Sequence, residues 1–146
     1  MNEQDLHVRN VTYAAFVELG RAPILDEIAA TAGLDRAETE GAWRRLHDAR
    51  ALVLDDDGAL RMANPFSAVE TPYRVHAAGR SWFGNCAWDA FGICAALHTD
   101  GDIECTCLDC GAPITVALRD ERPDDESLIF HCLVPAAHWW DDIVFT

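Results

Sequence analysis

The chain has 146 residues, half of them hydrophobic, and its 25 acidic residues against 11 basic ones give a net charge of −14. This length allows one or two small domains with a hydrophobic core. No apolar run reaches the roughly 18 residues of a membrane-spanning helix, and the first residues lack the apolar segment of a secretory signal, so we expect a cytoplasmic protein. Nucleic acids and anionic membranes are bound mainly through basic side chains, so the charge argues against both partners.

The first part of the chain has the pattern of three helices followed by a hairpin. Apolar side chains at helical spacing, with capping residues such as Asn10 and Asp35, predict helices over residues 10–20, 24–32 and 36–50. Alternating apolar residues on both sides of an Asp-Gly turn predict the hairpin. This layout indicates a winged-helix-like three-helix domain over residues 1–63.

A winged helix often binds DNA, and the third helix carries Arg44 and Arg45, with Arg50 at its end. The segment as a whole is net acidic, so a structural role is favoured here. Fold analogy by itself does not establish a function.

The second part has a mixed pattern. Residues 64–80 contain two prolines and no helical period, which indicates an extended connector. A helix is expected next, over residues 82–97. Strands are expected over residues 103–107, 112–118 and 128–134, and a short helix over residues 136–143. The chain is therefore predicted to have an α+β fold, with a small mixed α/β domain over residues 64–146.

Cys86 and Asp89 are the first candidates for chemistry. Three positions apart on the expected helix, they would lie on one face. A thiolate is a nucleophile and a soft-metal ligand, and a carboxyl group can hold or deliver a proton. Neighbouring aromatic residues such as Trp82 and Trp88 would form an apolar pocket that raises the carboxyl pKa. The spacing alone is common, so a buried cysteine beside a surface aspartate remains open as an interpretation.

The segment ECTCLDCGAP carries Cys105, Cys107 and Cys110. A C-x-x-C-G sequence is typical of one half of a zinc site, because glycine allows the tight turn around the metal. A structural zinc ion needs four ligands, and no second C-x-x-C exists, so Cys132 or a histidine would have to contribute. Reduced cysteines beside a hairpin and a redox-active pair are the alternatives. All six cysteines fall in the second half, which in a cytosolic chain favours metal binding or catalysis over disulfides.

Four segments in order, NPFSAVETPYRV, SWFGNCAWDAFGI, CLDCGAPITVAL and VPAAHWWDDIVFT, resemble the alkylmercury (organomercurial) lyase family. The resemblance implies a winged-helix-like domain joined to an α/β lyase domain, here residues 64–146. It also implies that Cys86 captures mercury and that Asp89 moves a proton onto the leaving carbon. Cys107 matches the family's C-x-x-T-G segment, whereas Cys110 departs from it.

In this family a second cysteine completes mercury capture, and the resemblance places it at or just after Thr146. Cys132 is the only downstream cysteine that could take this role. We therefore expect an organomercurial-lyase-like protein that binds a thiophilic metal compound. Its enzyme activity, a carbon–mercury lyase reaction, would be weak without a second thiolate.

The expected ligands are an organometal or soft metal ion, with Hg(II) as product, small thiols as acceptors and no organic cofactor. A non-catalytic soft-metal or zinc-binding module and a metal-responsive winged-helix regulator remain alternative functions.

Overall fold

The computed structural model describes residues 1–129 and 131–144, and it consists of helices and one antiparallel sheet. The helices are α1 (Glu3–Leu19), α2 (Leu25–Ala32), α3 (Arg36–Asp48) and α4 (Ala87–Leu97). The strands are β1 (Val53–Leu54), β2 (Leu60–Ala63), β3 (Phe66–Ser67), β4 (Arg74–Ala77), β5 (Arg80–Gly84), β6 (Gly101–Thr106), β7 (Pro113–Arg119) and β8 (Arg122–Pro123). A 3-10 helix, η1 (Ala136–Asp141), follows near the C-terminus. The predicted α+β class is confirmed.

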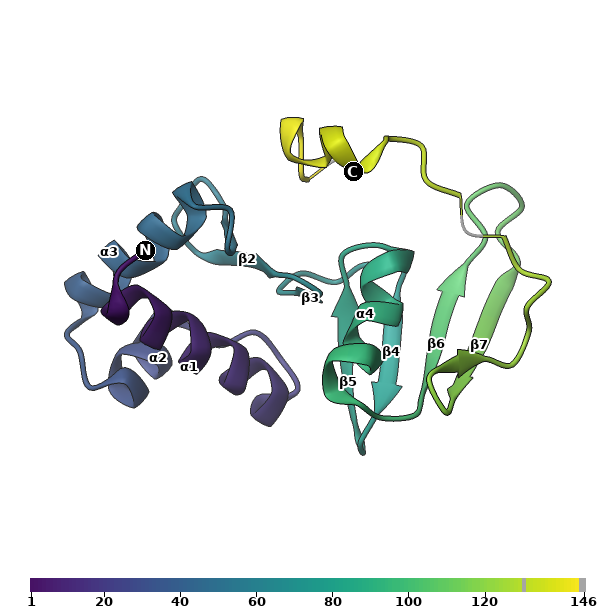
Figure 1. The fold of residues 1–146 in the computed structure, drawn as a ribbon, viewed down its shortest axis with the longest axis horizontal. Helices are drawn as coiled ribbons and strands as arrows, with labels where there is room; N and C mark the ends of the chain where they lie inside the picture. The colour runs from purple at the N-terminus through teal and green to yellow at the C-terminus, as the bar shows by residue number, and fades with distance from the viewer. Residues whose placement is uncertain (130, 145–146) are drawn as a thin grey trace.

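The sheet order is β1-β2-β3-β5-β4-β6-β7-β8, and every neighbouring pair is antiparallel. Helices α1 to α3 lie beside β1 and β2, whereas α4 lies against β4 and β5 (Figure 1). The chain after β8 returns over the top of the molecule, so that η1 comes to lie above the space between the N-terminal helices and α4 (Figure 1). No helix within the described ranges is both long and apolar enough to cross a membrane.

Helix α1 starts earlier than the sequence suggested. Asn2, rather than Asn10, caps it, because the Asn2 side chain accepts from the Asp5 N–H at 2.8 Å while Asp5 accepts from the Asn2 N–H at 3.0 Å. Asp35 caps α3 as predicted, with Glu38 completing the capping box. The three helices and the β1–β2 hairpin are confirmed as elements, whereas the winged-helix interpretation and the boundary between residues 63 and 64 remain predictions.

The helices and the sheet share one hydrophobic core. Phe16 of α1 stacks on Phe66 of β3 at 5.4 Å, and Phe66 contacts Trp82 of β5 at 6.0 Å between ring centroids. The Trp82 indole N–H donates to the Phe16 carbonyl oxygen at 2.8 Å, which satisfies its only polar atom inside the core. This aromatic cluster fixes α1 against the strand that leads into α4.

Three predictions for the second half are corrected. The connector over 64–80 contains strands β3 and β4, and the helix expected over 82–97 begins only at Ala87. Residues 82–84 belong to β5 instead, where Trp82 and Gly84 alternate toward the core. The strand expected over 128–134 is absent from its described residues, because side chains such as Ile129 and Leu133 are exposed and pack on no neighbouring strand, while residue 130 lies outside the described part.

Candidate active site

Cys86 and Asp89 lie together where β5 passes into α4. Cys86 is the N-cap residue of α4, and Asp89 is in its first turn. The Cys86 thiol donates to Asp89 Oδ2 across 3.8 Å, so the pair that the spacing suggested is close in space although Cys86 lies outside the helix. The turn fits under the helix because Gly84 has no side chain: a Cβ atom there would lie 2.7 Å from the Ala90 nitrogen.

The surroundings of this pair raise the pKa of both groups. Burial raises the pKa of the Cys86 thiol, and the backbone N–H groups of Asp89 and Trp88 at the helix start oppose that effect. Burial also raises the pKa of the Asp89 carboxyl, and hydrogen bonding from the Asn85 and Cys86 side chains opposes it. A carboxyl group with a raised pKa retains a proton more readily near neutral pH, which suits a proton donor.

Asn85, which directly precedes Cys86, holds the loop at Asn64 and Pro65 by hydrogen bonds. Its Nδ2 donates to Asn64 Oδ1 at 3.1 Å and to the Pro65 carbonyl oxygen at 3.4 Å. The Asn64 carbonyl oxygen in turn accepts from the Tyr13 hydroxyl of α1 at 3.0 Å. Burial raises the pKa of Tyr13, and the nearby Asp89 carboxylate adds to that increase. Tyr13, Asn64 and Asn85 were missed from the sequence, because contacts between such distant positions leave no local pattern.

A second thiol lies on β6, which is separated by β4 from the strand that leads to Cys86, β5. Cys105 of β6 is on the same face of the sheet as Gly101, whose position is covered by Cys94 of α4. Tyr73 directly precedes β4. Burial raises the pKa of Tyr73, and the Cys105 and Cys86 thiolates raise it further. Both thiolates thus act electrostatically on the same side chain, Tyr73. Cys94 is a buried core residue.

The remaining predicted ligands lie elsewhere. Cys107 and Cys110 are on one turn, where the Gly111 N–H donates to the Cys107 carbonyl oxygen at 2.9 Å and Gly111 has a positive φ of 72°. The backbone N–H of Cys110, followed by that of Asp109, lowers the pKa of Cys107. Cys132 is exposed, with its thiol 3.0 Å from the Val134 carbonyl oxygen. No three His, Cys, Asp or Glu side chains in residues 1–129 and 131–144 lie together as a metal site.

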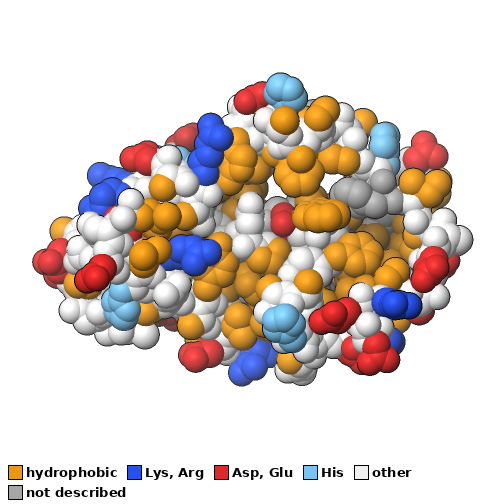
Figure 2. Space-filling model, viewed as in Figure 1, with side chains coloured by type: hydrophobic (Ala, Val, Ile, Leu, Met, Phe, Trp, Pro, Cys, Tyr) orange, Lys and Arg blue, Asp and Glu red, His pale blue; other side chains and the backbone are white. Residues whose placement is uncertain are grey.

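Hydrophobic side chains gather in the middle of the molecular face shown in Figure 2, below the C-terminal segment, while most charged side chains lie around the rim. The Cys86 thiol and the Asp89 carboxyl group are both half-buried. Such surroundings can hold an apolar compound of a soft metal beside a nucleophile and a proton donor. The position expected for the family's second cysteine, at Thr146 or after it, lies outside the described residues.

Comparison with known proteins identifies the fold and the family of the chain. Several solved structures match, among them the crystal structure of the mercury-bound form of MerB2. That match has a TM-score of 0.65 and 22% sequence identity, and it covers 86% of this chain and 60% of the MerB2 chain. The chain therefore spans about 60% of the length of that protein. No curated protein matches the chain. The family model described as alkylmercury lyase matches residues 66–146, which is more than half of the sequence and includes both Cys86 and Asp89, so the chain belongs to the alkylmercury lyase family.

Proposed function

We propose that this protein captures an organomercurial through Cys86 and cleaves its carbon–mercury bond with a proton delivered by Asp89. The observation that carries the proposal is the 3.8 Å contact between the two side chains, both half-buried and both with a raised pKa. Membership of the alkylmercury lyase family supports the same reaction class. The predicted catalytic roles of the two residues rest on this combination.

The reaction balances with the groups present. The Cys86 thiol passes its proton to the Asp89 carboxylate, and the resulting thiolate attacks mercury in R–Hg–X. Asp89 then gives the proton to the carbon of R as the C–Hg bond breaks, with its electron pair going to carbon. The products are R–H and mercury held as Cys86–S–Hg–X, and the Asp89 carboxylate is restored. Mercury is substrate and product here, and it leaves by exchange with small thiols.

A second thiolate would hold the Hg(II) product more firmly, because soft thiolates are its preferred ligands. Cys132 was predicted for this role, and it is exposed. Cys105 is a further candidate, because the charges of the Cys105 and Cys86 thiolates both raise the pKa of Tyr73. The variants Cys105→Ser and Cys132→Ser would distinguish the two candidates. Removal of the thiol that holds the product should lower mercury retention, and removal of the other should not.

The test is hydrocarbon release from a simple alkyl- or arylmercury compound with excess small thiol, comparing the chain with its Cys86→Ser variant. Release that depends on Cys86 is expected. If Cys86→Ser leaves the release rate unchanged, the assignment is wrong. Mercury bound at Cys86 without release would support the alternative of a non-catalytic soft-metal module.

The zinc alternative has one supporting feature, the Cys107–Cys110 turn, which supplies two thiols. The regulator alternative draws less support from the arginines of α3. Arg44 pairs with Glu40, and Arg45 pairs with the buried Asp5 at 2.7 Å. These two guanidinium groups are therefore engaged within the fold, which leaves less positive charge for a phosphate backbone.

A further inference from the structure

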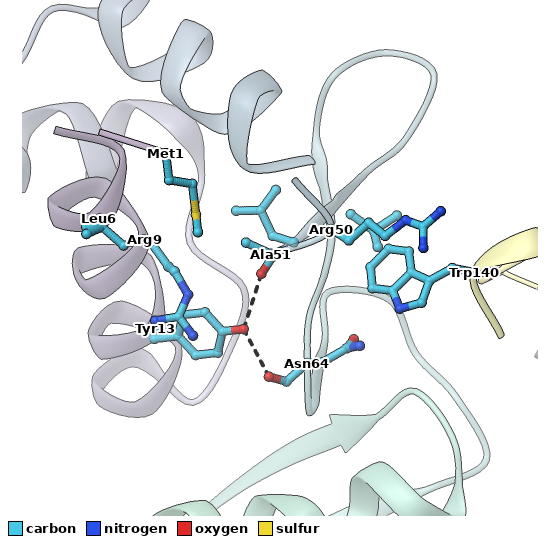
Figure 3. A pocket seen from close by; sticks show the side chains of 10 residues that line it. Met1, Leu6, Arg9, Tyr13, Arg50, Ala51, Asn64 and Trp140 are labelled. Atoms are coloured by element: carbon cyan, nitrogen blue, oxygen red, sulfur yellow. Dashed lines mark hydrogen bonds between the residues drawn. The ribbon is translucent and has the colours of Figure 1, made fainter. Parts of the chain in front are cut away.

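A cavity of about 400 Å³ lies between α1, the β1–β2 region and η1. Its lining includes Tyr13, Asn64 and Trp140, together with the arginines Arg9 and Arg50 (Figure 3). Its size is within the range of small-molecule binding sites, about 300–1,000 Å³. The two aromatic rings and two guanidinium groups give it an unusual chemical character for so acidic a chain.

The cavity adjoins the candidate active site through shared residues. The Tyr13 hydroxyl donates to the Asn64 carbonyl oxygen at 3.0 Å, as the dashed line in Figure 3 shows. The side chain of Asn64 accepts from Asn85 at 3.1 Å, and Asn85 directly precedes Cys86. The Asp89 carboxylate is also near enough to raise the pKa of Tyr13. Asn64, which lines the cavity, and Asn85, which precedes Cys86, therefore connect the cavity to the candidate active site.

Arg9 and Arg50 are the charged side chains that the described residues contribute to the cavity lining. The Arg9 guanidinium lies 4.8 Å from the centroid of the Tyr13 ring, and that of Arg50 lies 5.6 Å from a Trp140 ring. Within residues 1–129 and 131–144, neither forms an ion pair with a carboxylate, unlike Arg21 or Arg45. An anionic group entering the cavity would find two guanidinium groups that form no salt bridge with an acidic side chain of the described residues.

We propose that this cavity binds the organic group of the mercurial and selects an aromatic group that carries a carboxylate. The proposal rests on the lyase function proposed above. The ring would pack against Tyr13 and Trp140, and Arg9 and Arg50 would both pair with the carboxylate through charge-assisted hydrogen bonds. Neutral alkylmercurials would react at the same Cys86 thiol without the ring packing and without the pairing of a carboxylate with arginine.

The first experiment compares 4-mercuribenzoate with phenylmercury as substrates of the full chain and of its Arg9→Gln and Arg50→Gln variants. A matched control is Arg74→Gln, because Arg74 also lies over an aromatic ring, Phe83, at 5.8 Å, but does not line this cavity. Each cavity variant should lower the ratio of kcat/KM for the carboxylate substrate to that for phenylmercury about tenfold, the effect of one charge-assisted hydrogen bond. The control should leave the ratio unchanged.

A second experiment does not depend on turnover. Benzoate and neutral benzamide, which contain no mercury, are titrated into the full chain and followed by NMR shifts. Benzoate should bind more tightly than benzamide, and Arg9→Gln and Arg50→Gln should remove the difference. Equal binding of the two compounds, or the same loss in Arg74→Gln, would overturn the proposal. If neither mercurial is cleaved while benzoate binds as expected, the lyase function fails and the anion site stands.

Discussion

The tight contact between Gly84 and α4 gives a direct test of how the fold positions the site. A Cβ atom on Gly84 would lie 2.7 Å from the Ala90 nitrogen and 3.0 Å from its Cα. Ordinary contact begins near 3.4 Å, so Gly84→Ala would have to displace the helix by about 0.7 Å. Because the obstructing atoms are backbone atoms, the substitution should lower the free energy of unfolding by about 1–3 kcal/mol.

The displaced turn carries Asp89, while Cys86 lies just before it. Their 3.8 Å separation should therefore change. A misplacement near 1 Å can lower a catalytic rate about 100-fold, so Gly84→Ala should reduce Cys86-dependent hydrocarbon release by about 10- to 100-fold. The rate at which iodoacetamide alkylates Cys86, followed by mass spectrometry, gives a measure of the same change without turnover.

Gly101→Ala is the matched control. A Cβ atom there would lie 2.7 Å from Cys94 Sγ and 2.9 Å from the His76 carbonyl oxygen, at the end of β6 remote from Asp89. Urea unfolding should show a loss of stability in both variants, whereas only Gly84→Ala should change the reactivity of Cys86. Equal changes in the two variants, or an unaltered Cys86 in Gly84→Ala, would refute this account of the site.

Three further predictions concern titration. Hydrogen bonding from Arg45 lowers the pKa of the buried Asp5 below its ordinary 3.8, so Arg45→Met should lower the urea midpoint at neutral pH, and this loss should shrink below about pH 4, where Asp5 becomes protonated. Burial raises the pKa of Asp89, so ionisation of Asp89 destabilises the folded state. Asp89→Asn should therefore raise the urea midpoint at pH 7, and this gain in stability should disappear in acid, where Asp89 is protonated. Hydrocarbon release should cease in the same variant. Backbone N–H groups lower the pKa of Cys107 and burial raises that of Cys86, so iodoacetamide at pH 7 should label Cys107 first, and the reverse order would contradict this assignment.

The sequence predicted the elements with strong local signals. The hydrophobic spacing located α2 and α3, and Asp35 was correctly expected to cap α3. The start of α1 was placed too late, because Asn2 precedes polar residues that hide the helical period. Residues 82–84 of β5 were predicted as helix, whereas in the structure Gly84 packs under α4 and Trp82 packs against Phe66. That tertiary contact leaves no trace in local periodicity.

The candidate site was predictable to a similar extent. Cys86 and Asp89 could be paired from their spacing and from the family resemblance, although the helix start separates them in structure. The groups that surround them could not be predicted, because Tyr13 and Asn64 are 51 positions apart and are joined by one hydrogen bond. Local spacing can identify reactive side chains, but it cannot show which distant segment determines their solvation.

That distant segment has a specific consequence for the proposed chemistry. A raised pKa helps Asp89 to act as a proton donor, and burial is what raises the pKa of this carboxyl group. The loop at Asn64 lies beside this buried site. The Tyr13 hydroxyl of α1 donates to the Asn64 carbonyl oxygen, and Asn85, next to Cys86, donates to the Asn64 side chain. The family model begins at residue 66, yet Tyr13 and Asn64 precede that point. Helix α1 therefore contributes to the environment of the proposed reaction, and under the cavity proposal a change in α1 would alter substrate selection while Cys86 and Asp89 stay unchanged.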